Sequence, residues 1–311
     1  MAKVKDTEAI LGRFSIKVIP PRDLRTLENT EECLNFFRDM RDPRNRVESP
    51  TTNYVSMDLS DIVTIDYATI SILTAISDDL KANGVILSGN FPKDQACKNF
   101  IAESGFLSHM YFGNKKGEKA KHSDLIFFEK GSGKLSERDS IKIGELIKGA
   151  VEYLTGKKKH HQQLRTVILE ICGNAIEHAS TKDRQWLLGV KLENEKVQFT
   201  IADVGKGILD TLHRKYTKIL GDLFNSRSDH EVLARAFVQK YGSSTKEVNR
   251  NKGLPAIKEA SENGTIVNLV AITNNVVLNF GNPALSRTLS KGAPRFRGTF
   301  YQWEINKDCI S

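Results

Sequence analysis

The sequence predicts a mixed α+β protein made of two parts. In the first part, short runs that favour strands are each followed by a run with helical spacing, which predicts a small α/β layer. In the second part, residues 186–192, 196–202, 265–273, 276–280 and 297–305 favour strands, and short turns between neighbouring runs predict an antiparallel sheet. Helices over residues 140–154 and around residue 170 are expected to cover one face of this sheet.

The first part is expected to alternate strand and helix throughout. Pro20 and Pro21 end its first strand, and Asn83 with Gly84 stops its second helix. A last strand begins at Leu125, and the glycines that follow it suggest a hinge, so the predicted domains are residues 1–131 and 132–311. The strands are expected at residues 13–19, 54–59 and 85–88, and the helices at residues 24–40, 68–83 and 94–104.

Composition is that of an ordinary globular protein. Of the 311 residues, 39% are hydrophobic and 27% charged, and no apolar run approaches the ~20 residues of a membrane span. The N-terminus lacks a signal-peptide pattern, and Cys33, Cys97, Cys172 and Cys309 form no CxxC pair, so we expect reduced thiols and a cytoplasmic protein. The net charge of +8 is spread along the chain, so it does not require a nucleic-acid partner.

One run in the second part carries polar side chains at helical spacing. Glu170, Asn174 and His178 are four residues apart and would share one face of a helix. The residues around them are mostly apolar, which predicts a helix packed on a core. A carboxylate, a carboxamide and an imidazole on such a face are costly unless a polar group lies against them. A nucleotide with its metal ion would be such a partner.

A second run predicts a ligand-binding turn. The alternating residues 197–202 end at Asp203, and Gly205 and Gly207 follow. The carboxylate can accept a hydrogen bond from an exocyclic amine, and the glycines let the backbone approach a ligand closely.

With two later motifs, these runs resemble the GHKL ATP-binding family of gyrase, sensor histidine kinases and anti-sigma-factor kinases. The first run is similar to the N box of that family, and Asp203 to Gly207 are similar to its G1 box. Residues 242–246 and 252–259 resemble the lid and the G2 box, and Gly298 with Thr299 resembles the final Gly-Thr element. The resemblance implies a Bergerat-type sandwich of helices on an antiparallel sheet, with ATP and Mg²⁺ as cofactors.

The resemblance also implies roles for single residues at the phosphate end. Asn174 would ligate Mg²⁺ through its side-chain oxygen, the atom type that this ion prefers. Glu170 would be the general base for water or for the hydroxyl of a partner. Each residue also has a simpler interpretation: Asn174 would cap local backbone, and Glu170 would form a salt bridge on the helix face. Two more groups of residues belong to the phosphate end. The first is Ser244, Thr245 and Lys246, which would contact the γ-phosphate unless they form a plain solvated loop. The second is Gly253 and Leu254, which begin the next helix.

At the base end, Asp203 would read the adenine amino group. Gly205 and Gly207 would shape the turn, Ile208 would line the adenine pocket, and Thr299 would lie near the base. For His178, direct contact with the nucleotide and a hydrogen bond to the lid both stay open.

Residues 54–107 resemble, over a shorter motif, the STAS domain of anti-sigma-factor antagonists. Ala68 occupies the place of the phosphoserine in that family and Thr69 the place of a glycine. A STAS-like domain here would therefore act in docking or structure rather than as a phosphate acceptor.

These resemblances predict an ATP·Mg-binding protein that is a slow ATPase or a serine/threonine protein kinase of the anti-sigma-factor type. The alternative is a non-catalytic, ATP-gated binding or regulatory module that acts through its N-terminal domain. Either function implies a protein partner or self-association through that domain. Neither implies nucleic acid or a membrane.

Overall fold

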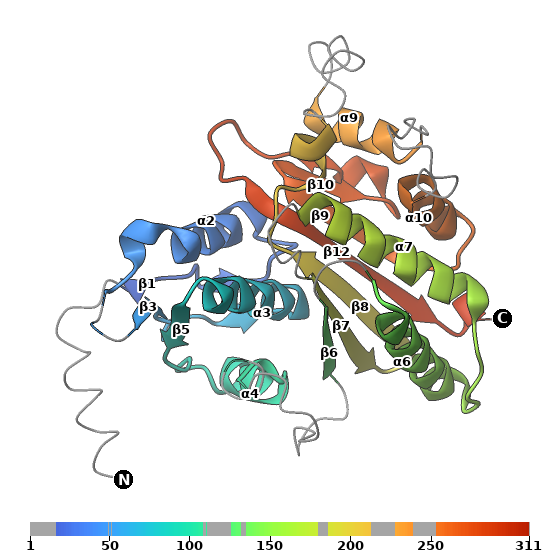
Figure 1. The fold of residues 1–311 in the computed structure, drawn as a ribbon, viewed down its shortest axis with the longest axis horizontal. Helices are drawn as coiled ribbons and strands as arrows, with labels where there is room; N and C mark the ends of the chain where they lie inside the picture. Colours follow the sequence, from blue (N-terminus) through green and yellow to red (C-terminus); the bar gives the residue numbers. More distant parts are fainter. Residues whose placement is uncertain are drawn as a thin grey trace. The chain divides into compact units, whose positions relative to one another are not determined.

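The computed structural model describes residues 17–48, 50, 52–107, 110, 126–131, 135–179, 186–212, 228–238 and 253–310, with the backbone alone for 126–131 and 175–179. The chain divides into two compact units, Met1–Lys119 and Ala120–Ser311 (Figure 1). The expectation of a mixed α+β protein with an antiparallel sheet is confirmed.

The first unit has two small parallel sheets and three described helices. Strands β1 (Lys17–Val18), β3 (Asn53–Met57) and β5 (Val85–Gly89) pair in the order β1-β3-β5, and β2 (Asp23–Leu24) pairs with β4 (Thr64–Ile65). The helices are α2 (Thr30–Arg41), α3 (Tyr67–Ala82) and α4 (Gln95–Glu103), and a 3₁₀ turn spans Pro43–Asn45.

Polar side chains set the ends of these helices. The Asp66 carboxylate accepts a hydrogen bond from the Thr69 backbone N–H at 2.7 Å and caps α3, and Asp94 caps α4 in the same way through Cys97. Helix α2 begins at Thr30 rather than near residue 24, because Asp23 and Leu24 pair with β4 instead. Thr69 is fully buried and its hydroxyl donates to the Leu24 carbonyl, so its role in the fold is structural.

The second unit is built on a seven-stranded antiparallel sheet in the order β11-β10-β9-β12-β8-β7-β6. The strands are β6 (Ile126–Gly131), β7 (Trp186–Glu193), β8 (Lys196–Asp203), β9 (Val267–Asn274), β10 (Val276–Asn279), β11 (Arg287–Thr288) and β12 (Phe296–Asn306). The described helices of this unit are α6 (Glu137–Thr155), α7 (Gln162–Ala179), α9 (Asp229–Ala236) and α10 (Gly253–Glu262), with 3₁₀ turns at Pro283–Leu285 and Asp308–Ile310.

The boundary between the units lies earlier than the one expected after residue 131. Strand β6 was assigned from its sequence to the N-terminal domain, but it pairs with β7 at the edge of the second sheet. The partner strand is more than fifty residues further along the chain, so no local pattern indicates this pairing.

Alternate residues of the central strands form the core of the second unit. Phe199 on β8 and Trp303 on β12 stack with their ring centroids 5.4 Å apart, and helices α6 and α7 pack over this face of the sheet (Figure 1). Phe199 and Trp303 lie on the same face as the other alternate core residues of these strands, and the intervening residues of β8 are buried on the opposite face as well. None of the described helices is long and apolar enough to cross a membrane.

Candidate functional site

The two central strands of the second unit meet at Asp203, the last residue of β8. Asp203 is the register partner of Thr299 on β12, and its carboxylate is fully buried. The Thr299 backbone N–H donates to Oδ2 at 3.0 Å, and the Gly205 N–H donates to Oδ1 at 2.9 Å. Both carboxylate oxygens are therefore held by backbone donors, which fixes the orientation of the side chain.

The residue before Thr299 must be glycine for the strands to approach this closely. Gly298 has a φ of +146°, and a Cβ placed on it would lie 2.0 Å from the Asp203 carbonyl oxygen. That oxygen belongs to the backbone, so no rotamer change could make room.

The turn after Asp203 is held by the end of β9. The backbone N–H of Ile208 donates to Thr273 Oγ1 at 2.9 Å, and the Asn274 amide donates back to the Lys206 carbonyl at 2.9 Å. Gly207 has a φ of +82°, and a Cβ on it would lie within 2.7 Å of both supporting side chains. Thr273 and Asn274 are site-supporting residues that the sequence did not reveal, because it indicated only a strand end and a hairpin there.

Asn174 and Gly253 form the second part of the site. Asn174 on α7 is 8% exposed, and its Nδ2 has no hydrogen-bond partner among the described residues. A Cβ on Gly253, the first residue of α10, would lie 2.8 Å from both Nδ2 and Oδ1 of this amide. A half-turn of the amide would exchange the two atoms, so an oxygen could take the place of the unpartnered Nδ2.

Two buried hydroxyls lie on the same face of β12. Thr299 Oγ1 and Tyr301 Oη are fully buried and have no hydrogen-bond partner among the described residues. Burial, and to a lesser extent the charge of Asp203, raises the pKa of the Tyr301 phenol well above its ordinary value. The phenol therefore keeps its proton at neutral pH and can act as a donor. The sequence indicated Thr299 but not Tyr301, which has only the strand alternation typical of a core residue.

Some of the other predicted site residues have described side chains, and the rest lie outside the described residues. Glu170 is half-buried on α7, one turn before Asn174. Ile208 is fully buried after the turn, and Leu254 packs against the core from α10. The backbone of His178 continues α7, but its side chain lies outside the described residues, as do Ser244, Thr245 and Lys246.

The donor set of the site fits a magnesium nucleotide. Among the described residues there is no cluster of three or more histidine, cysteine or acidic side chains that would hold a metal by itself. Mg²⁺ commonly keeps its waters and takes only one or two protein ligands besides phosphate oxygens. The buried amide of Asn174, beside a glycine that leaves room for it, meets that requirement.

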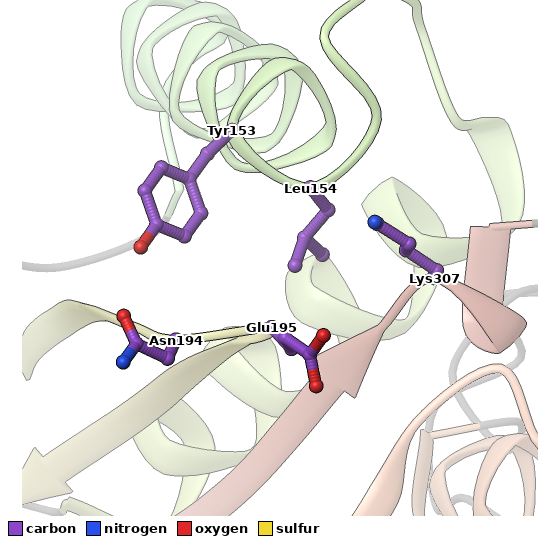
Figure 2. A pocket seen from close by; sticks show the side chains of 5 residues that line it. All are labelled: Tyr153, Leu154, Asn194, Glu195 and Lys307. Atoms are coloured by element: carbon purple, nitrogen blue, oxygen red, sulfur yellow. The ribbon is translucent and has the colours of Figure 1, made fainter.

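A cavity of about 630 Å³ lies at the opposite end of the same sheet (Figure 2). Tyr153 and Leu154 line it from the end of α6, and Asn194 and Glu195 line it from the β7–β8 turn, with Lys307 after β12. The Tyr153 hydroxyl donates to the Glu193 carbonyl at 3.2 Å. A second cavity of about 370 Å³ lies in the first unit, and neither cavity is lined by a predicted site residue.

No family model matches the sequence, and no curated protein matches it. A function for the second unit is therefore inferred from its motifs and from the geometry described above. That geometry provides a fixed buried carboxylate in register with Thr299, a second buried hydroxyl two residues along the same strand, and a buried amide on the covering helix.

Proposed function

We propose that the second unit is a GHKL-type ATP-binding domain with the Bergerat arrangement. The observation that carries the proposal is the junction of β8 and β12, where two backbone N–H groups fix the buried Asp203 carboxylate beside the Thr299 hydroxyl. An apolar core does not need a carboxylate and an unpartnered hydroxyl side by side, because each is costly to bury. A ligand with an amine edge would give the Thr299 hydroxyl a partner and add one donor to the Asp203 carboxylate, which already accepts two backbone hydrogen bonds.

The site residues divide between the two ends of a nucleotide. The base end contains the turn and the fixed carboxylate, and its residues are Asp203, Gly205, Gly207, Ile208 and Thr299. Asn174, Gly253 and Leu254 form the phosphate end. Helix α10 begins at Gly253, and the backbone N–H groups of a helix N-terminus favour phosphate.

The proposed reaction is slow ATP hydrolysis or phosphorylation of a serine or threonine on a protein partner. Bound Mg²⁺ would neutralise phosphate charge, with Asn174 as its protein ligand. Glu170 lies one turn earlier on the same helix and would accept the proton of the attacking water or hydroxyl. Phosphoryl transfer mainly needs positioning and charge neutralisation, so one base with one metal is chemically sufficient.

A STAS-like docking role is proposed for the first unit. Its Thr69 hydroxyl is buried and bonded to the Leu24 carbonyl and to Thr26 Oγ1, which supports a scaffold rather than a phosphate acceptor. The unit would bind a protein partner or a second copy of the chain. If the second unit binds ATP without turnover, the protein would be an ATP-gated regulatory module instead.

The test has a binding arm and a turnover arm. Melting temperatures are measured with ATP, ADP and GTP, each with and without Mg²⁺, because a ligand of the native state raises the melting temperature by mass action. We expect an adenine-selective rise in the wild type, and none in Asp203→Asn. The matched control is Glu304→Gln, a carboxylate on β12 that is bonded to Lys196 and Asn268 at the far end of the strand. A wild type that ATP does not stabilise contradicts the proposed function.

In the turnover arm, phosphate release from ATP and transfer to protein are measured for the wild type and for Glu170→Gln. We expect the variant to keep the thermal shift and to lose about 100-fold or more in rate, within the range that a general base contributes. ATP binding with no turnover by the wild type would favour the regulatory module over the enzyme.

A further inference from the structure

Four buried aromatic or hydroxyl side chains of the second unit carry a polar atom without a hydrogen-bond partner among the described residues. They are Trp186 Nε1, Thr299 Oγ1, Tyr301 Oη and Trp303 Nε1. Buried donors and hydroxyls are nearly always bonded to protein or to ordered water, so each such atom needs an explanation.

Three of these four residues are neighbours of Asp203 in the sheet. In the sheet register, Trp186 and Thr299 are the direct partners of Asp203 on its two sides. Tyr301 lies two residues beyond Thr299 on the same strand, and therefore on the same face. Trp303 is two residues deeper again and stacks on Phe199, so its indole belongs to the aromatic core.

Of the three residues near Asp203, Trp186 and Tyr301 are not yet part of the proposed site, and only Tyr301 carries a hydroxyl. Its ring would pack equally well as phenylalanine, which has the same shape without the hydroxyl. The hydroxyl is within electrostatic reach of the Asp203 carboxylate, whose charge contributes to the raised pKa of the phenol. It is therefore a protonated donor on a residue that is the diagonal neighbour of Asp203 on the same face of the sheet.

We propose that the Tyr301 hydroxyl is a specificity-determining group of the nucleotide site, and that it donates, directly or through one ordered water, to the ring nitrogen beside the exocyclic amine of adenine. This inference rests on the proposed function and adds a residue to it. Asp203 accepts from the amine and Tyr301 donates to the adjacent ring nitrogen, so the pair presents an acceptor and a donor side by side. The corresponding edge of guanine has a carbonyl oxygen and a protonated ring nitrogen, so it presents the reverse pattern.

The test compares Tyr301→Phe with Tyr153→Phe in the full chain. Both variants lose one phenolic hydroxyl, but Tyr153 lies at the opposite end of the sheet and its hydroxyl bonds the Glu193 carbonyl. Dissociation constants are measured by calorimetry for ATP and for 1-deaza-ATP, which has a carbon in place of the ring nitrogen. We expect Tyr301→Phe to weaken ATP binding about 3- to 10-fold, the range of one neutral hydrogen bond, and Tyr153→Phe to leave it unchanged.

The analogue isolates the contact. With 1-deaza-ATP the ring nitrogen is absent, so Tyr301→Phe should cost less than about two-fold relative to the wild type, as in a double-mutant cycle. The melting temperature of ligand-free Tyr301→Phe should be unchanged or raised, because the variant removes a buried hydroxyl that has no partner.

The outcomes are distinguishable. Equal ATP affinity in Tyr301→Phe and the wild type, or an equal loss with both nucleotides, overturns this inference and leaves the proposed function standing. If the wild type binds neither ATP nor ADP, both are overturned. A lowered melting temperature of the free variant would show that the hydroxyl is bonded within the protein, and this too overturns the inference.

Discussion

Gly298 shows most directly how one residue sets the geometry of the site. Its φ of +146° is unfavourable for any other residue, and an added Cβ would contact Asp203 and Val204 backbone atoms at 2.0–3.0 Å. We expect Gly298→Ala to lower the free energy of unfolding by more than about 3 kcal/mol, since strain and a backbone clash add. Gly292→Ala is the matched control, because its φ of +89° brings strain but no atom lies within 4 Å of the new Cβ.

The measurement is urea unfolding of the second unit at neutral pH. The control should lose only about 1 kcal/mol, the usual cost of a left-handed alanine. Equal losses in the two variants would mean that β12 does not approach β8 as closely as described.

The sequence predicted which residues lie close together best where a motif names them. Asp203, Gly207 and Thr299 were each predicted as site residues, and the structure brings them together at one end of the sheet. Thr273 and Asn274 were not predicted as site residues, although they hold the turn by hydrogen bonds across 65 residues of sequence. A threonine at a strand end and an asparagine in a hairpin have ordinary local explanations, so only the three-dimensional register reveals their second role.

At the scale of elements, the ends of β3 and β5 in the first unit are joined through Asp58. Its carboxylate accepts hydrogen bonds from Ser60 Oγ at 2.6 Å and Asn90 Nδ2 at 2.7 Å, and it pairs with Lys17 at 3.1 Å. The bonds from Ser60 and Asn90 hold the pKa of this carboxyl well below its usual range. Asp58 therefore connects β1, β3 and the loop after β5.

Because of this connection, we expect the first unit to become less stable at acidic pH. A carboxyl with a lowered folded-state pKa stabilises fully above its unfolded-state pKa of about 3.8, and this stabilisation is lost as the pH falls further. We expect Asp58→Asn to cost about 1–3 kcal/mol at pH 7 and clearly less at pH 2.5. Asp61→Asn, which removes an exposed ion pair with Lys93, should cost less than about 1 kcal/mol. A cost for Asp58→Asn that does not change with pH would contradict this assignment.

The elements themselves were predicted well where local signals were strong. The α3 and α4 helices end beside glycines with positive φ as expected, and the short turn expected after residue 273 joins β9 and β10. The aspartate caps at Asp66 and Asp94 were not predicted. Strand β6 was assigned to the wrong sheet, because strand propensity indicates that a strand forms but not its partner. The short β2 and β11 strands were not expected, since two residues carry no periodic signal.

At the scale of the whole molecule, the division into two units allows the effect of ATP binding on each unit to be measured separately. The proposed nucleotide residues lie in the second unit, and proteins with more than one unit need not unfold in a single transition. At free ATP·Mg about 100 times its dissociation constant, mass action adds about 2.7 kcal/mol to the stability of the unit that binds it. We therefore expect ATP·Mg to raise the calorimetric transition of the second unit and to leave that of the first unit in place.

Hydrogen exchange with and without ATP·Mg then locates the effect. We expect slower exchange at the C-terminal end of β8, the N-terminal end of β12 and around Asn174 on α7, because these segments carry the fixed carboxylate, the glycine contact and the buried amide. Exchange in β3 and β5 should not change if the protein is an enzyme whose site is complete in the second unit. Protection that extends to β3 and β5 would require ATP to bias the first unit as well, which is the coupling that defines a regulatory module. Asp203→Asn serves as the control, because a change that persists in this variant would not come from the proposed site.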